Sequence, residues 1–315
     1  MHETQKFSPV SVHWRITSSC NLRCKHCYVA AGDQNISVNL SDSKNFIDLM
    51  AKAWPVEEII ISGGEPTLHP NVKEIIEYVT TKRIKPIIFT NGILTETIKK
   101  ILPIDELAFI VSLDGFREDH EKLRGPNTWV KTLETISLLI KEKRNLTISF
   151  SVNNYNIEKS EAFLKFLTEL GVEKVAISQF MPLGRGFLNK ELCVNYKDYI
   201  RVIEQIKNFS EKSSTEIAVS EEDGLTCTGG INRVSINEKF EVYPCPLLTS
   251  KSRWLMGRVP EIFSEEIIPL QLSFLYKKNK DIACKNCSSN NWCSCVALMD
   301  MYHMLFYSEN YSFKN

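Results

Sequence analysis

The sequence lacks the features that would place a protein on a nucleic acid or in a membrane. Its 315 residues include 38 basic and 38 acidic side chains, so the formal net charge is zero and gives no electrostatic reason to expect a nucleic-acid partner. No apolar run approaches the roughly 20 residues that a membrane-spanning helix needs. The polar start, Met1–Lys6, is unlike a secretory signal. We therefore expect a cytoplasmic protein with no nucleic-acid and no membrane partner.

The chain also lacks a linker rich in glycine, serine or proline, and it has no internal repeat. Hydrophobic residues make up 43% of it, which is ample for a buried core. Cysteine is nearly absent from the middle of the chain, where Cys193 stands alone, yet the other nine of the ten cysteines form two groups. In a reducing compartment, clustered cysteines indicate metal or redox chemistry rather than disulfides.

Strand-like and helical patterns alternate from Val10 to about Phe209. Short apolar runs typical of buried parallel strands lie at 10–16, 59–61, 87–89, 109–111, 148–152 and 175–177. Apolar residues at helical spacing follow at 72–79, 129–140 and 163–170, the last stopped by Gly171. Six such units predict an α/β fold, a partial (β/α)6 TIM-like barrel, because a full barrel needs eight. A doubly wound sheet is the alternative.

Beyond Ser210 the pattern changes, so we expect two domains, 1–210 and 211–315. The second should contain a strand at 217–219, a hairpin at 233–243 that turns near Asn237, and helices at 264–278 and 296–306. The charged segment 118–122, with Arg124, is interpreted as a solvated loop.

The first cysteine group directly follows the first predicted strand. Cys20, Cys24 and Cys27 lie within eight residues, so a single loop can direct three thiolates at one metal centre. A cubane iron–sulfur cluster normally takes four cysteines, and three would leave one iron open for catalysis. The alternative is a structural zinc site with His26 as the fourth ligand, and the spacing alone leaves both open.

Small or polar residues close the next four predicted strands, at the end of a β/α barrel where its chemistry lies. These strand ends are Gly63-Gly64-Glu65-Pro66, Thr90-Asn91-Gly92, Ser112-Leu113-Asp114-Gly115 and Ser151-Val152-Asn153. Together they predict a polar rim, of the size of a small ligand, beside the cysteine loop.

These two motifs make the sequence resemble the radical S-adenosylmethionine (SAM) superfamily over Val10–Phe209. The cysteines match its Cys-x3-Cys-x2-Cys signature, with the aromatic His26 before the last cysteine, and Gly63–Pro66 matches its glycine motif. The resemblance implies that the three cysteines hold a [4Fe-4S] cluster whose open iron binds SAM. An external one-electron reductant, flavodoxin- or ferredoxin-like, would reduce the cluster. SAM would then be cleaved to a 5′-deoxyadenosyl radical that abstracts hydrogen from the substrate.

The resemblance also implies which residues bind SAM. The backbone and side chain of Gly63, Gly64 and Glu65 would hold its methionine amino group, and Tyr28 would place its backbone against the adenine. Candidates for the ribose and the carboxylate are Ser112, Asp114 and Asn153, chosen because they end strands.

The second cysteine group resembles the SPASM domain, or its shorter Twitch form, which binds auxiliary [4Fe-4S] clusters. Met181–Arg185 is also similar to that subgroup. The sequence departs from the SPASM pattern because Ser294 alone separates the last two cysteines, none follows them, and Phe240 replaces a glycine. One cluster on four of the cysteines, two clusters, or zinc are all open. The expected ligands are Cys227, Cys245, Cys284, Cys287, Cys293 and Cys295.

Most members of this subgroup modify ribosomally made peptides or proteins by crosslinking, epimerisation or oxidation, and we expect the same here. Because the barrel is predicted to begin near Val10, no N-terminal leader-recognition domain is expected. The alternatives are a radical SAM dehydrogenase of a small molecule such as an aminocyclitol, and a non-catalytic zinc scaffold. Cys193 is a further candidate, as a hydrogen-atom donor, although a packing role is the simpler interpretation.

Overall fold

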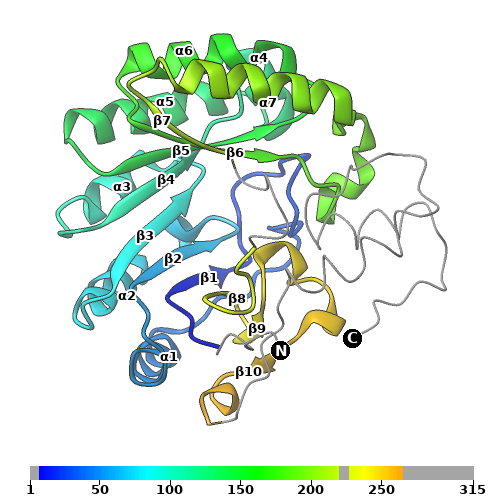
Figure 1. The fold of residues 1–315 in the computed structure, drawn as a ribbon. Helices are drawn as coiled ribbons and strands as arrows, with labels where there is room; N and C mark the ends of the chain where they lie inside the picture. Colours follow the sequence, from blue (N-terminus) through cyan, green and yellow to red (C-terminus); the bar gives the residue numbers. More distant parts are fainter. Residues whose placement is uncertain (1–6, 220–226, 265–315) are drawn as a thin grey trace, which may run out of the picture.

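Ten strands form a single curved sheet in the computed structural model, which describes residues 7–219 and 227–264 (Figure 1). Their order is β10-β9-β8-β1-β2-β3-β4-β5-β6-β7. All neighbours from β8 through β1 to β7 pair in parallel, whereas β9 pairs antiparallel with both β8 and β10. The strands are β1 (Ser11–Thr17), β2 (Glu58–Gly63), β3 (Lys85–Thr90), β4 (Ala108–Ser112), β5 (Leu146–Val152), β6 (Lys174–Gln179), β7 (Glu216–Val219), β8 (Arg233–Ile236), β9 (Glu241–Tyr243) and β10 (Gly257–Arg258).

Helices cover the outer face of this sheet (Figure 1). They connect successive parallel strands, as the crossover in a β/α unit requires. Asn39 caps the first helix by accepting from the backbone N–H of Asp42, and Gly171 ends the sixth at φ 92°. The helices are α1 (Leu40–Ala53), α2 (Val72–Thr80), α3 (Thr95–Ile101), α4 (Arg117–Arg124), α5 (Thr128–Lys141), α6 (Ser160–Leu170) and α7 (Tyr196–Ser210).

The two faces of β1 show how the sequence separates the core from the interior of the barrel. Val12, Trp14 and Ile16 are fully buried and belong to the hydrophobic core beneath the helices. The ring of Trp14 lies 4.7 Å from that of Phe46 on α1. Because side chains alternate along a strand, the residues between them, His13 and Arg15, face the other side. The inner face of the sheet is therefore polar at β1.

The structure confirms an α/β fold with a parallel sheet, and it contains all six predicted strands of residues 10–177. The predicted hairpin is also present as β8 and β9. The sheet continues across the expected domain boundary, since β7 pairs with β6, and β8 returns to pair with β1. The expected helices at 264–278 and 296–306 lie outside the described residues, apart from Ser264.

The prediction of a solvated loop at 118–122 is wrong, because this segment forms α4. Its inner face carries Leu123, which packs against Phe180 and Leu192, and a buried Asp119 that accepts from Lys159 at 2.9 Å. Gly125 ends the helix at φ 115°. In the described part of the chain, no helix is both long and apolar enough to cross a membrane.

Candidate active site

A cavity of about 390 Å³ opens where the parallel strands β1–β6 end. Its wall brings together all three cysteines of the first group and five further residues predicted from the sequence. Two other predicted residues, Glu65 and Asn153, are not on this wall. The predicted residues on the wall are Cys20, Cys24, Cys27, Tyr28, Gly63, Gly64, Ser112 and Asp114.

The backbone of the cysteine loop is folded around its own sulfur atoms. The N–H of Leu22 donates to Cys20 Sγ at 3.4 Å, and the N–H of Ala31 donates to Cys27 Sγ at 3.3 Å. Such donors stabilise a thiolate. Burial nevertheless raises the pKa of Cys20 to about 11, and burial also raises the pKa of Cys24. A positively charged metal centre is therefore what this loop needs to hold its sulfurs as thiolates.

The donor set fits a three-cysteine cluster better than a zinc ion. His26, the expected fourth zinc ligand, lies with its Nε2 3.4 Å from Asp114 Oδ2. Among residues 7–219 and 227–264, no three His, Cys, Asp or Glu side chains are placed to hold a single metal ion. In a cubane each cysteine binds a different iron, so its ligands stand farther apart than those of one ion.

The glycine turn after β2 lies directly on the start of the cysteine loop. A Cβ on Gly63 would lie 2.4 Å from the carbonyl oxygen of Thr17, and one on Gly64 would lie 2.3 Å from that of Ser19. Two backbone hydrogen bonds, Gly64 N–H to Thr17 and Glu65 N–H to Ser19, join the segments at 2.8 Å. Only glycine permits this contact, which places the turn beside the three sulfurs.

Glu65, whose side chain is expected to contact SAM, is not itself on the cavity wall. Its carboxylate is fully buried and accepts from the Asn91 N–H at 2.7 Å and from the Thr90 hydroxyl at 2.6 Å. It also accepts from the N–H and hydroxyl of Thr67. Burial raises the pKa of Glu65, while these donors oppose that shift. Glu65 therefore ties the turn after β2 to the turn after β3.

Asp114, at the end of β4, lies in a buried ion pair with Arg124 from α4. Asp114 Oδ2 accepts from Arg124 Nε at 2.6 Å, and Oδ1 accepts from the Ser151 N–H at 2.9 Å. Burial disfavours the charged carboxylate, but Arg124 and then His26 outweigh it, so the pKa of Asp114 is lowered. Arg124 is itself on the cavity wall. Arg124 is not among the residues predicted to bind the cofactor, because the charged segment around it was interpreted mainly as a solvated loop.

Asn153 closes the turn after β5 instead of facing the cavity. Its Oδ1 accepts from the Tyr155 N–H, and its Nδ2 donates to the Ser151 carbonyl, both at 2.9 Å. With both polar atoms occupied and only 1% of its surface exposed, it is not placed to bind the ribose. Ser112 does line the cavity, as does Tyr28, and burial raises the pKa of Tyr28 to about 12.

The model of the radical SAM superfamily matches residues 14–167, which span the cysteine loop, the glycine turn and Asp114. The chain therefore contains a radical SAM domain. It is 30% identical to an AdoMet-dependent heme synthase of Methanosarcina barkeri, over 67% of this chain and 61% of that protein. It is 26% identical to AlbA of Bacillus subtilis, a subtilosin biosynthesis protein, over 76% of this chain and 55% of that one. The chain thus spans less than two thirds of these relatives.

The fold matches solved structures over almost the whole chain. Streptococcus suis SuiB, bound to its precursor peptide SuiA, superimposes with a TM-score of 0.70 at 15% identity. The match covers 94% of this chain and 71% of SuiB. At this identity the likeness shows the fold alone.

Arg185 ties the far wall of the radical SAM cavity to the cysteine loop. Its Nε donates to the Cys24 carbonyl at 3.2 Å and its Nη2 to the Ala31 carbonyl at 2.7 Å, while Nη1 pairs with Asp33 at 2.9 Å. The preceding Gly184 is at φ 54°, and a Cβ there would lie 2.6 Å from the Cys27 carbonyl oxygen. Gly184 and Arg185, which the sequence analysis included only for their similarity to the subgroup, thus hold the cysteine loop in place.

The cavity wall carries a neutral histidine, His13, and several hydroxyl groups among apolar side chains such as Phe89 and Met181. His13 Nε2 lies 2.6 Å from the Ser62 hydroxyl. Burial, and then the charge of Arg15, lower the pKa of His13 to about 4. Hydroxyl groups from further strands lie on the same wall, those of Ser149, Ser151 and Ser178. The alternation of apolar and polar residues along β1 could have identified His13, because its side chain faces the other side of the sheet from that of its neighbour Trp14.

The second cysteine group is described only in part. Cys227 precedes β8, and Cys245 follows β9, so the hairpin joins them; both are half-buried. Pro246 and Leu247, directly after Cys245, line the cavity. Cys193 is half-buried beside the Leu123 cluster and is not on the cavity wall. The remaining expected ligands, Cys284, Cys287, Cys293 and Cys295, lie outside the described residues.

Proposed function

We propose that this protein is a radical SAM oxidoreductase or maturase that abstracts a hydrogen atom from a ribosomally made peptide or protein side chain. The outcome would be a crosslink, an epimerisation or an oxidation. The observation that carries this proposal is the placing of three cysteine thiols and a glycine turn on one wall of a cavity at the strand ends. When bound, the reduced cluster would supply the electron that cleaves SAM and so generates the hydrogen-abstracting radical.

The residues on the cavity wall divide the binding of cluster and SAM between them. Cys20, Cys24 and Cys27 would hold the cluster, and the backbone at Gly63 and Gly64 would accept hydrogen bonds from the methionine amino group of SAM. Arg124 would bind the SAM carboxylate. Only its Nε is bonded to Asp114, and its side chain, which is 10% exposed, lines the cavity. Ser112 and the backbone of Tyr28 would contact the ribose and the adenine.

The charges of the interior favour a peptide over a tetrapyrrole. Fe-coproporphyrin III carries several propionate carboxylates, which would need cations. The cations on the cavity wall already have carboxylate partners, since Arg124 pairs with Asp114 at 2.6 Å and Arg185 with Asp33 at 2.9 Å. The rest of the wall consists of hydroxyls, a neutral His13 and apolar side chains. Uncharged polar groups, such as peptide amides and hydroxyls, suit these walls. SuiB, which shares the fold, was solved with a precursor peptide.

The second cysteine group would bind one or two auxiliary [4Fe-4S] clusters. Cys245 precedes two residues of the cavity wall, so a cluster bound through it would lie near the substrate. Such a cluster would accept an electron from the substrate radical or anchor the substrate. An external reductant of flavodoxin or ferredoxin type would reduce the SAM cluster.

Metal analysis after anaerobic reconstitution tests the cofactor assignment. A chain with one SAM cluster and one auxiliary cluster should hold about eight irons, falling to about four in a Cys20/Cys24/Cys27→Ala variant. About twelve falling to about eight would indicate two auxiliary clusters. Stoichiometric zinc without iron uptake would overturn the radical SAM function and support a zinc scaffold.

A substrate screen tests the peptide assignment. The reconstituted, dithionite-reduced protein is incubated with SAM and one of three probes: short peptides encoded beside its gene, Fe-coproporphyrin III, or an aminocyclitol. A peptide that gains or loses mass in step with 5′-deoxyadenosine formation would support the proposal. Turnover of the porphyrin or the aminocyclitol alone would assign the enzyme to a small molecule instead.

A further inference from the structure

The cysteine loop carries a lysine that shares one aromatic ring with a second lysine. Lys25 lies in the loop between Cys24 and Cys27, and Lys122 is an exposed residue of α4. Their Nζ atoms stand 5.7 Å and 3.8 Å from the centroid of the Tyr155 ring. The ring face attracts both ammonium groups, so it keeps two positive charges together at this point of the surface.

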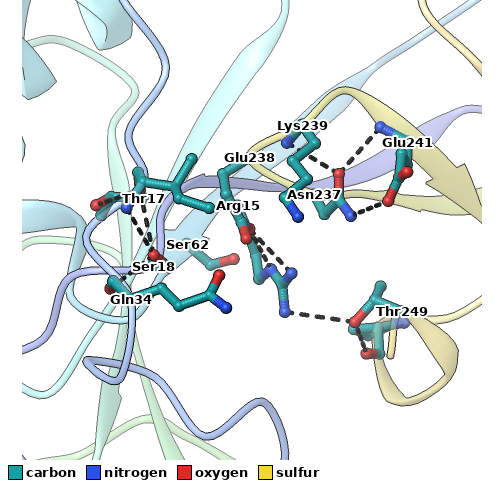
Figure 2. A network of polar contacts seen from close by, with 12 residues as sticks. Arg15, Thr17, Ser18, Gln34, Ser62, Asn237, Glu238, Lys239, Glu241 and Thr249 are labelled. Carbon is teal, nitrogen blue, oxygen red and sulfur yellow. Dashed lines mark hydrogen bonds and ion pairs between the residues drawn. The ribbon is translucent and has the colours of Figure 1, made fainter. Parts of the chain in front are cut away.

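No carboxylate neutralises these two charges within the described residues. Neither ammonium group forms an ion pair there, and the adjacent Glu191 accepts from the Tyr155 hydroxyl at 3.4 Å instead. Arg15, on the inner face of β1, is different because it is paired with Glu238 at 2.9 Å (Figure 2). The outer side of the cysteine loop therefore has unpaired positive charge.

Exposed apolar side chains lie next to these cations. The Asn189 Nδ2 donates to the Lys25 carbonyl at 3.2 Å, which holds the segment after β6 against the cysteine loop. In that segment Phe187 and Leu188 are 45% and 80% exposed, and the Lys190 Nζ stands 5.0 Å from the Phe187 ring. Among the residues that the structure describes, only four large apolar side chains are exposed, and two of them are neighbours here. We call this surface the Tyr155 patch; it consists of Lys25, Lys122, Tyr155, Phe187, Leu188 and Lys190.

The Tyr155 patch lies outside the cavity but directly against its wall. None of the six residues lines the cavity, yet Lys25 stands between Cys24 and His26, which both do. The Lys25 N–H also donates at 2.8 Å to the carbonyl of Leu123, the residue before Arg124 of the wall. A partner on the patch would thus come close to the three thiols without entering the cavity, which SAM and the substrate occupy in the proposed function.

We propose that the Tyr155 patch is the docking surface of the acidic one-electron carrier that reduces the cluster on Cys20, Cys24 and Cys27. The inference rests on the proposed function, because it requires that cluster. For each SAM cleaved, the carrier loses one electron and the cluster gains it. Complexes of this kind bury little surface, below about 1,200 Å², so a few cations around an exposed apolar centre are enough. The unpaired ammonium groups would steer an acidic carrier to this side of the loop.

The test is the rate of 5′-deoxyadenosine formation from SAM, with electrons supplied either by flavodoxin and its NADPH-dependent reductase or by dithionite. Lys122→Glu/Lys190→Glu should raise the flavodoxin concentration for half-maximal rate by about tenfold or more at low salt, with an unchanged dithionite-driven rate. Added salt should slow the flavodoxin-driven rate of the native sequence far more than that of this variant. The matched control is Lys131→Glu/Lys165→Glu, which changes the total charge equally at exposed lysines of α5 and α6 and should leave both rates unchanged.

The two electron sources separate the docking surface from the proposed function. An equal loss in the control, a loss that also appears with dithionite, or no loss at all would overturn the docking surface. So would an equal loss in Lys122→Arg/Lys190→Arg, which keeps both charges. Cleavage with dithionite, but with neither flavodoxin nor an acidic ferredoxin, would show that no carrier of this class docks. Absence of cleavage with dithionite as well would refute the radical SAM function, and the proposal with it.

Discussion

Replacing Asp114 by asparagine should strongly destabilise the protein. The substitution preserves the shape of the side chain but removes the charge that lies 2.6 Å from Arg124 Nε. Asp114 is fully buried and the Arg124 side chain is 10% exposed, so the guanidinium would stay buried without its partner. Removing one member of a buried pair costs about 3–5 kcal/mol. We expect a loss of about this size in the free energy of unfolding.

Urea unfolding of the metal-free protein at pH 7, followed by tryptophan fluorescence, measures this loss. Glu96→Gln is the control, because it breaks an exposed pair with Lys99 and should leave the midpoint unchanged. The double variant Asp114→Asn/Arg124→Met should recover much of the stability, since it removes the unpaired charge as well. A loss below about 1 kcal/mol, the value of a surface pair, would refute the reasoning, as would a double variant no more stable than Asp114→Asn.

The same pair predicts part of the acid sensitivity of the protein. The pKa of Asp114 is lowered in the folded state because Arg124 and His26 outweigh the cost of burial. Its contribution to the free energy of unfolding is therefore fully present above the ordinary aspartate pKa, about 3.9. It is lost as the pH falls through the lower pKa of the folded state. Urea titrations below about pH 4 should show this loss in the native sequence. An equal loss in Asp114→Asn would contradict the assignment.

Three further predictions concern the cavity. Gly64→Ala should lower the free energy of unfolding by about 1–3 kcal/mol, because its methyl group would lie 2.3 Å from the Ser19 carbonyl oxygen. It should also weaken SAM binding, measured by equilibrium dialysis. Unchanged affinity would count against the glycine turn as a binding element. The pKa of His13 is lowered to about 4, so the free energy of unfolding should fall as the pH drops from about 6.5, because the unfolded chain then binds a proton that the folded chain does not. Urea titrations of His13→Gln should show a weaker dependence of stability on pH over this range. An unaltered dependence would refute the role of His13. Arg185→Met should release iron faster during dialysis than Arg201→Met, a control at an exposed pair; equal rates would exclude Arg185 as a support of the cluster loop.

Features set by local pattern could be predicted from the sequence. The strands ending at Gly63 and Ser112 follow from short apolar runs, and the proximity of their ends follows from parallel pairing. The β8–β9 hairpin was also foreseen. The return of β8 to pair with β1 was not, since such a pairing joins segments more than 200 residues apart and leaves no mark in local periodicity.

The roles of individual polar residues were harder to predict, because burial and partners decide them. Glu65 follows a glycine turn, but its carboxylate turns inward to the Asn91 N–H. Asn153 ends a strand yet bonds its own turn. Arg124 is one charge in a run of charges, and only the folding of α4 against the end of β4 brings it to Asp114. Spacing shows which residues end a strand, but not which way their side chains point.

Reductive cleavage of SAM tests the central claim most directly. The iron-loaded protein, reduced with dithionite under anaerobic conditions, should convert SAM to methionine and 5′-deoxyadenosine in equal amounts, and Cys24→Ala should abolish both products. Intact SAM in the presence of a fully loaded, reduced protein would contradict the account.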